Sequence, residues 1–143
     1  MSYPLLDVQH ISVDVDEKSV LHDVSLKINQ GETHVFMGPN GAGKSTFGNT
    51  IIGNPVYTVT HGKIFFDGKD ITEEKTDARA KAGMFLTFQS PLEVPGISLE
   101  AFIRSAIQQR TGERVKLFQF KKDLQEAMKL LNMDEEYAAR DLN

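Results

Sequence analysis

The sequence predicts an α/β domain with an antiparallel β start, one strand–loop–helix unit and a helical second half. Three observations carry this prediction. Apolar residues alternate over 8–15 and over 20–28, as they do in the half-buried strands of an antiparallel pair. The short apolar run 34–37 ends directly in a Gly-rich loop, which favours a strand buried on both faces. From residue 98 onward, apolar side chains recur at helical spacing.

Local signals predict the elements that follow the Gly-rich loop. Residues 45–52 form a helix with a glycine directly after it, where helices commonly stop. Residues 64–66 form a strand, and the Asp67-Gly68 pair after it is a strong hairpin signal. The polar, Ala-containing stretch 73–81 is predicted to be a second helix.

The second half is predicted to begin with a buried strand and a loop and to continue as helices. Residues 84–88 are apolar and aromatic, as expected of the strand. Residues 90–97 contain two prolines and a glycine, so we expect loop there. Ser98 can cap the next helix. Helical segments are then predicted over 121–131 and 134–139, with no strand after them.

The composition is that of a globular chain and excludes several functions. Its 143 residues suffice for one compact domain or for part of a larger one. The formal net charge of −4 lacks the basic excess that sequence-blind nucleic-acid binding needs, so we expect no nucleic-acid partner. The absence of cysteine excludes disulfides and thiolate metal ligands within the chain. No stretch approaches the roughly 18–20 apolar residues of a membrane span, and we recognise no signal peptide, so we expect no direct membrane insertion.

The Gly-rich segment 38–45 matches the pattern G-x-x-x-x-G-K-[ST] at every specified position. Glycines let the backbone turn tightly and point successive N–H groups at phosphate oxygens. The Lys44 ammonium can reach the β- and γ-phosphates, the Ser45 hydroxyl can ligate Mg²⁺, and Thr46 can donate to the α-phosphate. The pattern predicts that a nucleoside triphosphate and Mg²⁺ are bound by Gly38, Pro39, Asn40, Gly41, Ala42, Gly43, Lys44, Ser45 and Thr46.

Gln89 is a second candidate site residue. It ends the apolar stretch 84–88 and opens the Pro-rich loop. From the end of a buried strand, its amide could face the γ-phosphate and its metal. A glutamine at a strand end is more often a solvated loop residue, so its position in the sequence leaves both interpretations open.

Two classes of nucleotide enzyme fit the rest of the sequence poorly. A GTPase would need N-K-x-D and D-x-x-G motifs, and no Asp here is followed by Gly three residues later. The nearest match to the first motif, Glu74-Lys75-Thr76-Asp77, lies in a helix pattern. A small-molecule kinase would usually open with the strand before the phosphate loop, whereas two predicted strands precede that strand here.

The whole chain from Leu5 onward resembles the first half of an ATP-binding cassette (ABC) ATPase domain. The resemblance rests on D-V-S-L-K-I-N-Q-G-E at 23–32, G-P-N-G-A-G-K-S-T at 38–46, G-K-I-F-F-D-G-K-D-I at 62–71 and Gln89 as the Q-loop glutamine. It implies ATP as the nucleotide and catalytic roles for Lys44 and Gln89. It also implies Mg²⁺ bound through Ser45 and Gln89.

The resemblance implies a P-loop NTPase fold of the ABC type in which 1–143 is the N-terminal part of one domain. Its parts would be an antiparallel β subdomain, a P-loop core and the start of a helical subdomain. The expected bounds are 5–37 and 62–71 for the β regions, 38–53 for the P-loop and helix, 84–97 for the Q-loop strand and loop, and 98–143 for the helical subdomain.

Within that family the sequence looks like the ATPases of the Suf iron–sulfur cluster assembly system (SufC-like). The stretches that carry this are G-N-P-V-Y-T-V-T-H-G at 53–62, A-G-M-F-L-T-F-Q-S-P at 82–91 and L-E-V-P-G-I-S at 92–98. The resemblance implies a cytoplasmic ATPase that docks on SufB/SufD-like scaffold subunits through the region from Gln89 to Ile97. In the intact protein it implies an ATP-dependent homodimer.

The chain departs from the family pattern at two points. Many ABC ATPases stack adenine on an aromatic residue near the end of the first strand, where this chain has Val15. We therefore expect weak base stacking, and we expect Tyr3 and Tyr57 to be poorly placed to substitute. The signature motif, the Walker B Asp-Glu pair, the D-loop Asp and the switch His are not found in order. We expect a truncated chain that binds ATP but is not by itself a competent ATPase.

Three functions remain under consideration. The leading hypothesis is the ATP-binding part of an ABC ATPase that energises iron–sulfur cluster assembly on a Suf scaffold. The second is the nucleotide-binding subunit of an ABC transporter. The third is a non-catalytic nucleotide-binding module.

Overall fold

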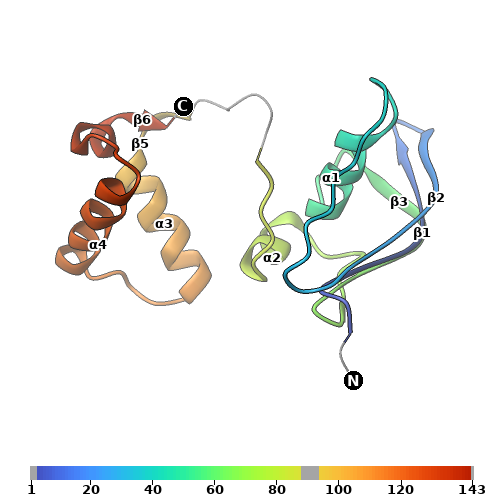
Figure 1. Cartoon of the computed structure of the whole chain (residues 1–143), viewed down its shortest axis with the longest axis horizontal. Coiled ribbons are helices and arrows are strands. Elements are labelled where there is room, and N and C mark those ends of the chain that lie inside the picture. Colours follow the sequence, from blue (N-terminus) through green and yellow to red (C-terminus); the bar gives the residue numbers. More distant parts are fainter. Residues whose placement is uncertain (1–2, 88–93, 143) are drawn as a thin grey trace. The chain divides into compact units, whose positions relative to one another are not determined.

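The computed structural model describes residues 3–87 and 94–142, which form two compact units (Figure 1). The first unit covers Met1–Leu86 and the second covers Thr87–Asn143. Each unit has its own β-sheet and its own helices.

The first unit is built on a four-stranded antiparallel sheet with the order β2-β1-β3-β4. Its strands are β1 (Leu6–Val15), β2 (Lys18–Ile28), β3 (Thr58–Phe66) and β4 (Lys69–Asp70). The alternating apolar patterns therefore predicted β1 and β2 and their antiparallel pairing correctly. The hairpin between β3 and β4 is also confirmed. However, β3 begins six residues earlier than predicted, in a β-branched run whose polar side chains are exposed.

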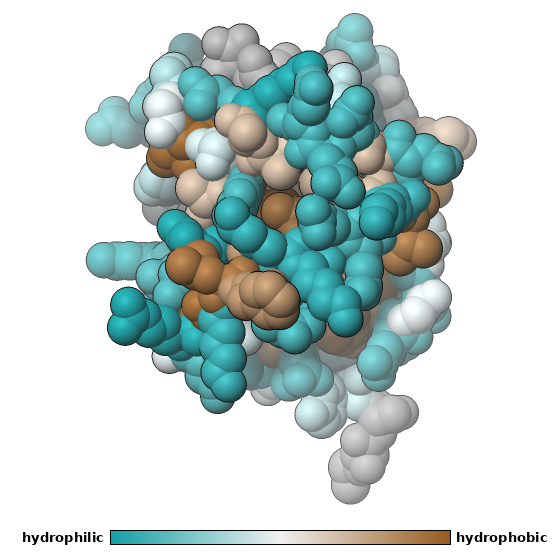
Figure 2. All heavy atoms as spheres, turned by 90° about the vertical axis from the view of Figure 1, so that its left-hand side faces the viewer, coloured by the Kyte–Doolittle hydropathy of each residue, from teal (hydrophilic) through white to brown (hydrophobic). Residues whose placement is uncertain are grey.

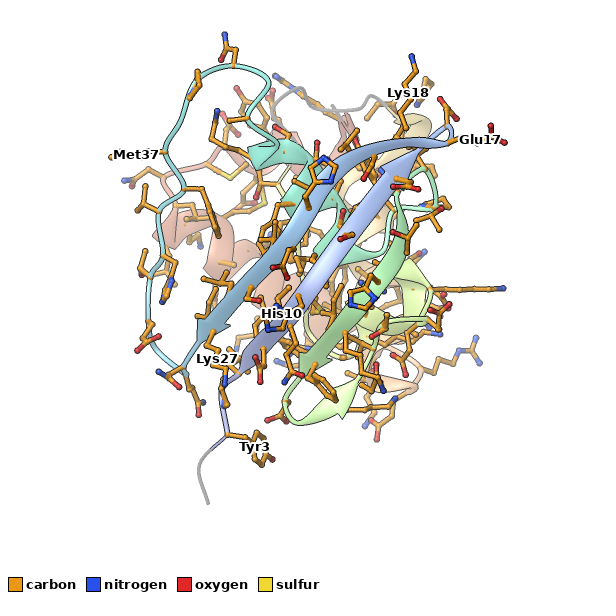
Figure 3. All side chains as sticks on the ribbon, turned by 90° about the vertical axis from the view of Figure 1, so that its right-hand side faces the viewer. Tyr3, His10, Glu17, Lys18, Lys27 and Met37 are labelled. Carbon is orange, nitrogen blue, oxygen red and sulfur yellow. The ribbon has the colours of Figure 1, made fainter. Side chains whose placement is uncertain are left out.

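The middle of β1 is irregular, and one glycine accommodates the irregularity. The register of β1 shifts against both neighbouring strands, and His10 adopts a φ of 51°. Gly62 on β3 has a φ of 83°, and a Cβ placed there would lie 2.3 Å from the carbonyl oxygen of Gln9. Only glycine allows the two backbones to approach so closely. His10 itself lies on the outer face of the sheet (Figure 3).

Helix α1 (Lys44–Ile52) packs on the inner face of this sheet (Figure 1). It ends at Gly53, whose left-handed φ of 78° confirms the predicted stop. A second, shorter helix, α2 (Thr76–Lys81), starts three residues later than the predicted helix 73–81. The core between α1 and the sheet consists of Val8, Ile11, Val13, Leu21, Phe47, Ile64 and Ile71.

Two predicted buried strands are not formed. Residues 34–37 are extended but unpaired, with 77% of Val35 and 89% of Met37 exposed. Residues 84–87 are likewise not a strand, and Phe85 is 88% exposed. Phe88 lies outside the described residues. A strand needs a neighbour for its N–H and C=O groups, and within 3–87 and 94–142 no strand pairs with either segment.

The second unit combines helices with a small strand pair. Its helices are α3 (Leu99–Thr111), α4 (Leu117–Leu130) and the 3₁₀ turn η1 (Glu135–Ala139). The predicted cap is confirmed, because the Ser98 hydroxyl accepts a hydrogen bond from the N–H of Ala101. The expectations of loop over 94–97 and of no final strand are wrong. These residues form β5 (Val94–Ser98), which pairs with β6 (Asp141–Leu142).

The surface of the helical unit is mainly polar. Figure 2 shows a largely hydrophilic face with separate apolar patches. Phe118, Leu130 and Leu131 are among the exposed apolar side chains of this unit. Among the described residues, no helix is both long and apolar enough to cross a membrane.

Candidate nucleotide-binding site

The Gly-rich segment forms an exposed loop that leads directly into α1, as predicted. The N–H of Ala42 donates to the carbonyl of Pro39 at 3.2 Å, which closes a turn within the loop. Gly41 and Gly43 have φ angles of 85° and 87°, in the left-handed region that favours glycine. The first hydrogen bond of α1 joins the N–H of Phe47 to the carbonyl of Gly43 at 2.8 Å. The loop is therefore a tight concave turn at a helix N-terminus.

A direct contact holds the loop against the β1–β2 hairpin. A Cβ on Gly43 would lie 2.7 Å from the Cδ2 of Leu21, so the leucine side chain occupies the space that any other residue would need. Leu21 is a buried core residue on β2. The second glycine of the pattern therefore serves packing as well as backbone conformation. The result is that the hairpin end lies beside the phosphate loop.

Lys44 folds back over the loop. Its Nζ donates to the carbonyls of Gly38 and Pro39, each at 2.8 Å. The first turn of α1 contains no acidic residue. A helix leaves its first N–H groups without intrahelical partners, and its dipole favours an anion at that end. The ammonium and these N–H groups together make the concave side of the loop attractive to phosphate.

The two hydroxyl residues of the pattern begin α1, next to Lys44. Ser45 is exposed and Thr46 is half-buried. The described residues contain no cluster of three or more His, Cys, Asp or Glu side chains able to hold a metal. A Mg²⁺ ion that binds through one hydroxyl, substrate phosphates and water does not need such a cluster. The exposed Ser45 hydroxyl fits a site of this kind.

Arg79 anchors the far end of α1, a role that no local sequence pattern predicted. Only 2% of this residue is exposed. Its guanidinium donates to the carbonyls of Thr50 and Ile51 in the last turn of α1, at 3.0 and 2.8 Å. It also donates to the carbonyls of Thr72 and Glu74, each at 2.9 Å. Burial lowers the pKa of Arg79, and the nearby Glu74 opposes this effect.

The arginine therefore ties the phosphate-loop helix to the segment between β4 and α2. The last carbonyls of a helix lack intrahelical partners, and Arg79 donates to two of them; that of Thr50 also accepts from the N–H of Gly53. Gly53 leaves the space it needs, because a Cβ there would lie 2.9 Å from the arginine Nε. The polar, Ala-containing composition of 73–81 predicted a helix. Composition does not reveal that one of the charged side chains in this helix is buried.

Hydrogen bonds fix the start of the segment that precedes the phosphate loop. The Glu32 carboxylate accepts hydrogen bonds from the backbone N–H and the side-chain amide of Asn29, at 2.8 and 2.9 Å. The pKa of Glu32 is lowered to about 2, mainly because the side-chain amide of Asn29 donates a hydrogen bond to the carboxylate. Hydrogen bonds from the Asn29 N–H and from His34 lower this pKa further. Beyond this turn, the Met37 side chain points away from the sheet (Figure 3).

The structure brings together only part of the predicted site. Residues 38–46 form one loop and the first turn of one helix. Gln89, predicted as a catalytic residue and a metal ligand, lies outside the described residues. Val15 ends β1 and is half-buried. The Tyr3 ring packs on Gly68, between β3 and β4, and it lies far from Glu17 at the hairpin end of the sheet (Figure 3).

These features define an α/β domain with a phosphate-binding loop. A family model described as "ABC transporter" matches residues 21–142. The chain therefore belongs to the ABC transporter family, in the part that folds as the ATP-binding cassette. This confirms the fold class predicted from the sequence.

Two curated relatives illustrate the similarity. Vegetative protein 296 of Bacillus subtilis (strain 168) is 43% identical over 145 residues, covering 100% of this chain and 56% of that protein. The probable ATP-dependent transporter ycf16 of Trieres chinensis is 36% identical over 146 residues, covering 99% and 58%. The chain thus spans a little over half the length of these relatives.

The fold is also found in solved structures. The dimeric structure of MJ0796, a bacterial ABC transporter cassette, aligns with a TM-score of 0.77 at 21% identity. The alignment covers 95% of this chain and 61% of that one.

Proposed function

We propose that this chain is the MgATP-binding part of an ABC ATPase that drives conformational work in a partner protein. The observation that carries the proposal is the phosphate loop at the start of α1. The loop combines left-handed glycines, a lysine folded over it and a helix start without acidic residues. Family membership supports ATP as the nucleotide.

The residues of the loop divide the work of binding. The N–H groups at the start of α1 face the phosphate oxygens, and the Lys44 ammonium moves from the carbonyls of Gly38 and Pro39 to the β- and γ-phosphates. The Ser45 hydroxyl would hold Mg²⁺, which would neutralise phosphate charge. Gln89 would help to hold the same ion and would orient the attacking water.

A binding experiment tests this proposal directly. Calorimetric titration of the full chain with MgATP should show binding that is much weaker without Mg²⁺ or in the Lys44→Ala variant. Tripolyphosphate should compete with MgATP, because the loop grips phosphate rather than base. Absence of any binding by the folded wild-type chain would refute the proposed function.

We further propose that the partner is a membrane transporter subunit or a soluble assembly scaffold, and each has its own support. The Trieres chinensis relative is named a probable ATP-dependent transporter, which favours the first. The run from Gln89 to Ile97 resembles Suf ATPases, which favours SufB/SufD-like scaffold subunits and iron–sulfur cluster assembly. Affinity capture from a cell extract separates them, since it recovers either an integral membrane permease or a soluble scaffold.

The remaining parts of the proposal concern hydrolysis and assembly. We place the protein in the cytoplasm and expect an ATP-dependent homodimer in the intact form, in line with the dimeric fold neighbour. The 143-residue chain, which lacks the signature and Walker B motifs, should show no Lys44-dependent ATP turnover. Turnover that is lost in Lys44→Ala would show instead that these residues suffice for catalysis.

A further inference from the structure

The phosphate loop contains the only asparagine of the sequence that is followed by glycine, Asn40 before Gly41. The side-chain amide of an asparagine can react with the backbone nitrogen of the next residue, and glycine hinders this attack least because it has no Cβ. The reaction needs an accessible side chain and a backbone N–H that is not held in a helix or a sheet. Both conditions depend on the conformation of the loop.

Asn40 and Gly41 are the two central residues of a turn. The N–H of Ala42 donates to the carbonyl of Pro39 at 3.2 Å and closes the turn, which leaves the N–H of Gly41 without a partner inside it. Over 3–87 and 94–142, no hydrogen bond engages the Gly41 N–H or the Asn40 side chain. Both residues are exposed, and a Cβ on Gly41 would meet nothing within 4 Å. The amide of Asn40 therefore has room to approach the Gly41 nitrogen.

The other described asparagines are less suited to this reaction. The side-chain amide of Asn29 donates to a carboxylate at 2.9 Å, and that of Asn49 donates to a carbonyl of its own helix at 2.8 Å. Asn54 precedes a proline, which has no N–H to react. The N–H that follows Asn132 donates to a helix carbonyl at 2.9 Å. Asn40 is thus the described asparagine best placed to react.

The charge of the loop favours the same reaction. Removing the proton from the Gly41 N–H and attacking the amide carbon both create negative charge in the loop. The Lys44 ammonium lies over the loop and donates to the carbonyls of Gly38 and Pro39, and the start of α1 adds partial positive charge. Positive groups close to developing negative charge lower the barrier to its formation. The electrostatics that suit the loop to phosphate therefore also promote the attack on Asn40.

We propose that Asn40 is a modification site, at which the phosphate loop deamidates itself while no nucleotide is bound. The Gly41 nitrogen loses its proton and forms a bond to the side-chain amide carbon of Asn40. The amide nitrogen leaves as ammonia and takes up a proton. Water then adds to the resulting cyclic imide and breaks either carbon–nitrogen bond of its ring. The products are aspartate and isoaspartate, so each outcome places a new carboxylate in the loop, and no atom is oxidised or reduced.

The consequence for nucleotide binding rests on the proposed function. A carboxylate in the loop repels phosphate and competes for the same donors. Asn40→Asp copies one product and should weaken MgATP binding about tenfold or more. Bound phosphates, in turn, occupy the backbone N–H groups of the loop and make the Gly41 nitrogen unavailable. Nucleotide should therefore protect the chain, and empty chains should lose nucleotide binding with time.

The first test follows the modification without nucleotide. The full chain is incubated at mildly alkaline pH, which favours loss of the amide proton, and peptide mass spectrometry measures the acid formed at each asparagine. Conversion at Asn40 should be at least about tenfold faster than at Asn132, and Gly41→Ala should slow it by a similar factor. Equal rates at Asn40 and Asn132 in the wild type overturn the inference. Conversion at Asn40 that is much slower in the folded chain than in concentrated urea overturns it too, because the folded loop would then hinder the reaction.

The second test measures protection by nucleotide. MgATP at about ten times its dissociation constant should slow conversion at Asn40 about tenfold and leave Asn132 unchanged. Tripolyphosphate should protect in the same way, because the phosphates cover the loop. Unslowed conversion at Asn40 in chains that demonstrably bind MgATP overturns the inference while the proposed function stands. If the fresh wild-type chain binds no MgATP but Asn40 still converts fastest, the proposed function fails and the modification site stands.

Discussion

The chain is held very differently on the two sides of the phosphate loop. After the loop, α1 packs on the sheet through Phe47, the Gly43–Leu21 contact fixes its start, and Arg79 fixes its end. Before the loop, residues 34–37 are unpaired and their apolar side chains are largely exposed. The geometry of the loop therefore depends on the helix and the antiparallel sheet, and within the described residues no paired strand precedes it.

The largest expected effect comes from the loop lysine. Lys44→Ala removes the ammonium that lies over the loop and should weaken MgATP binding by at least about thirtyfold. Isothermal titration measures the change. Lys63→Ala is the control, because this exposed lysine pairs with Asp70 on the sheet and should leave affinity unchanged. Similar affinities for Lys44→Ala and wild type would contradict a phosphate role for the loop.

The next largest effect concerns the far end of α1. Arg79→Met removes the donor to the carbonyls of Ile51, Thr72 and Glu74, and it should lower the free energy of unfolding by about 3 kcal/mol. Lys81→Met on the same helix is the matched control, because Lys81 is exposed and forms only a surface pair with Asp77. Urea denaturation compares the two. Equal losses would show that the arginine does not anchor the helix.

A third prediction compares two glycines of the same loop. Gly41 and Gly43 have nearly equal positive φ angles, but only a Cβ at Gly43 meets Leu21. Gly43→Ala should therefore be less stable than Gly41→Ala by about 1–3 kcal/mol, the usual cost of overpacking. Thermal melts measure the difference, and adding Leu21→Ala should reduce the clash. If both alanine variants have the same melting temperature, the contact between the loop and Leu21 does not contribute to stability.

A fourth, smaller effect depends on pH. Hydrogen bonds from the Thr72 hydroxyl, followed by Lys63 and the Thr72 N–H, hold the pKa of Asp70 at about 2, below that of an ordinary carboxyl. A depressed folded pKa means that this carboxylate stabilises the fold at neutral pH and that the stability is lost as pH falls from about 4 to 2. Asp70→Asn should flatten the dependence of the melting temperature on pH in this window. Parallel curves for variant and wild type would contradict it.

Local chemistry accounts for what the sequence predicted correctly. The phosphate loop, the Asp67-Gly68 turn and the Ser98 cap each depend on residues within a few positions of one another. The main failures concern non-local pairing. Whether 34–37 becomes a strand depends on a partner strand, and the β5–β6 pair joins segments more than forty residues apart.

The candidate site shows the same limit. Pattern matching found the Gly-rich loop, but the contacts that hold this loop in place come from other elements. Neither the burial of Arg79 nor the contact between Leu21 and Gly43 has a signature in the local sequence. Residue type predicts the chemistry of the site, whereas its support depends on tertiary packing.

The smallest expected effect comes from the exposed apolar residues that precede the loop. Val35→Ser and Met37→Ser replace exposed apolar side chains, so each should change the unfolding free energy by no more than about 0.5 kcal/mol. Light scattering should show less self-association, because exposed apolar patches promote it. Phe47→Ser, at a buried position in α1, is the contrasting variant and should be strongly destabilising. If Val35→Ser were as damaging as Phe47→Ser, residues 34–37 would be packed in solution, and the two sides of the loop would be held alike.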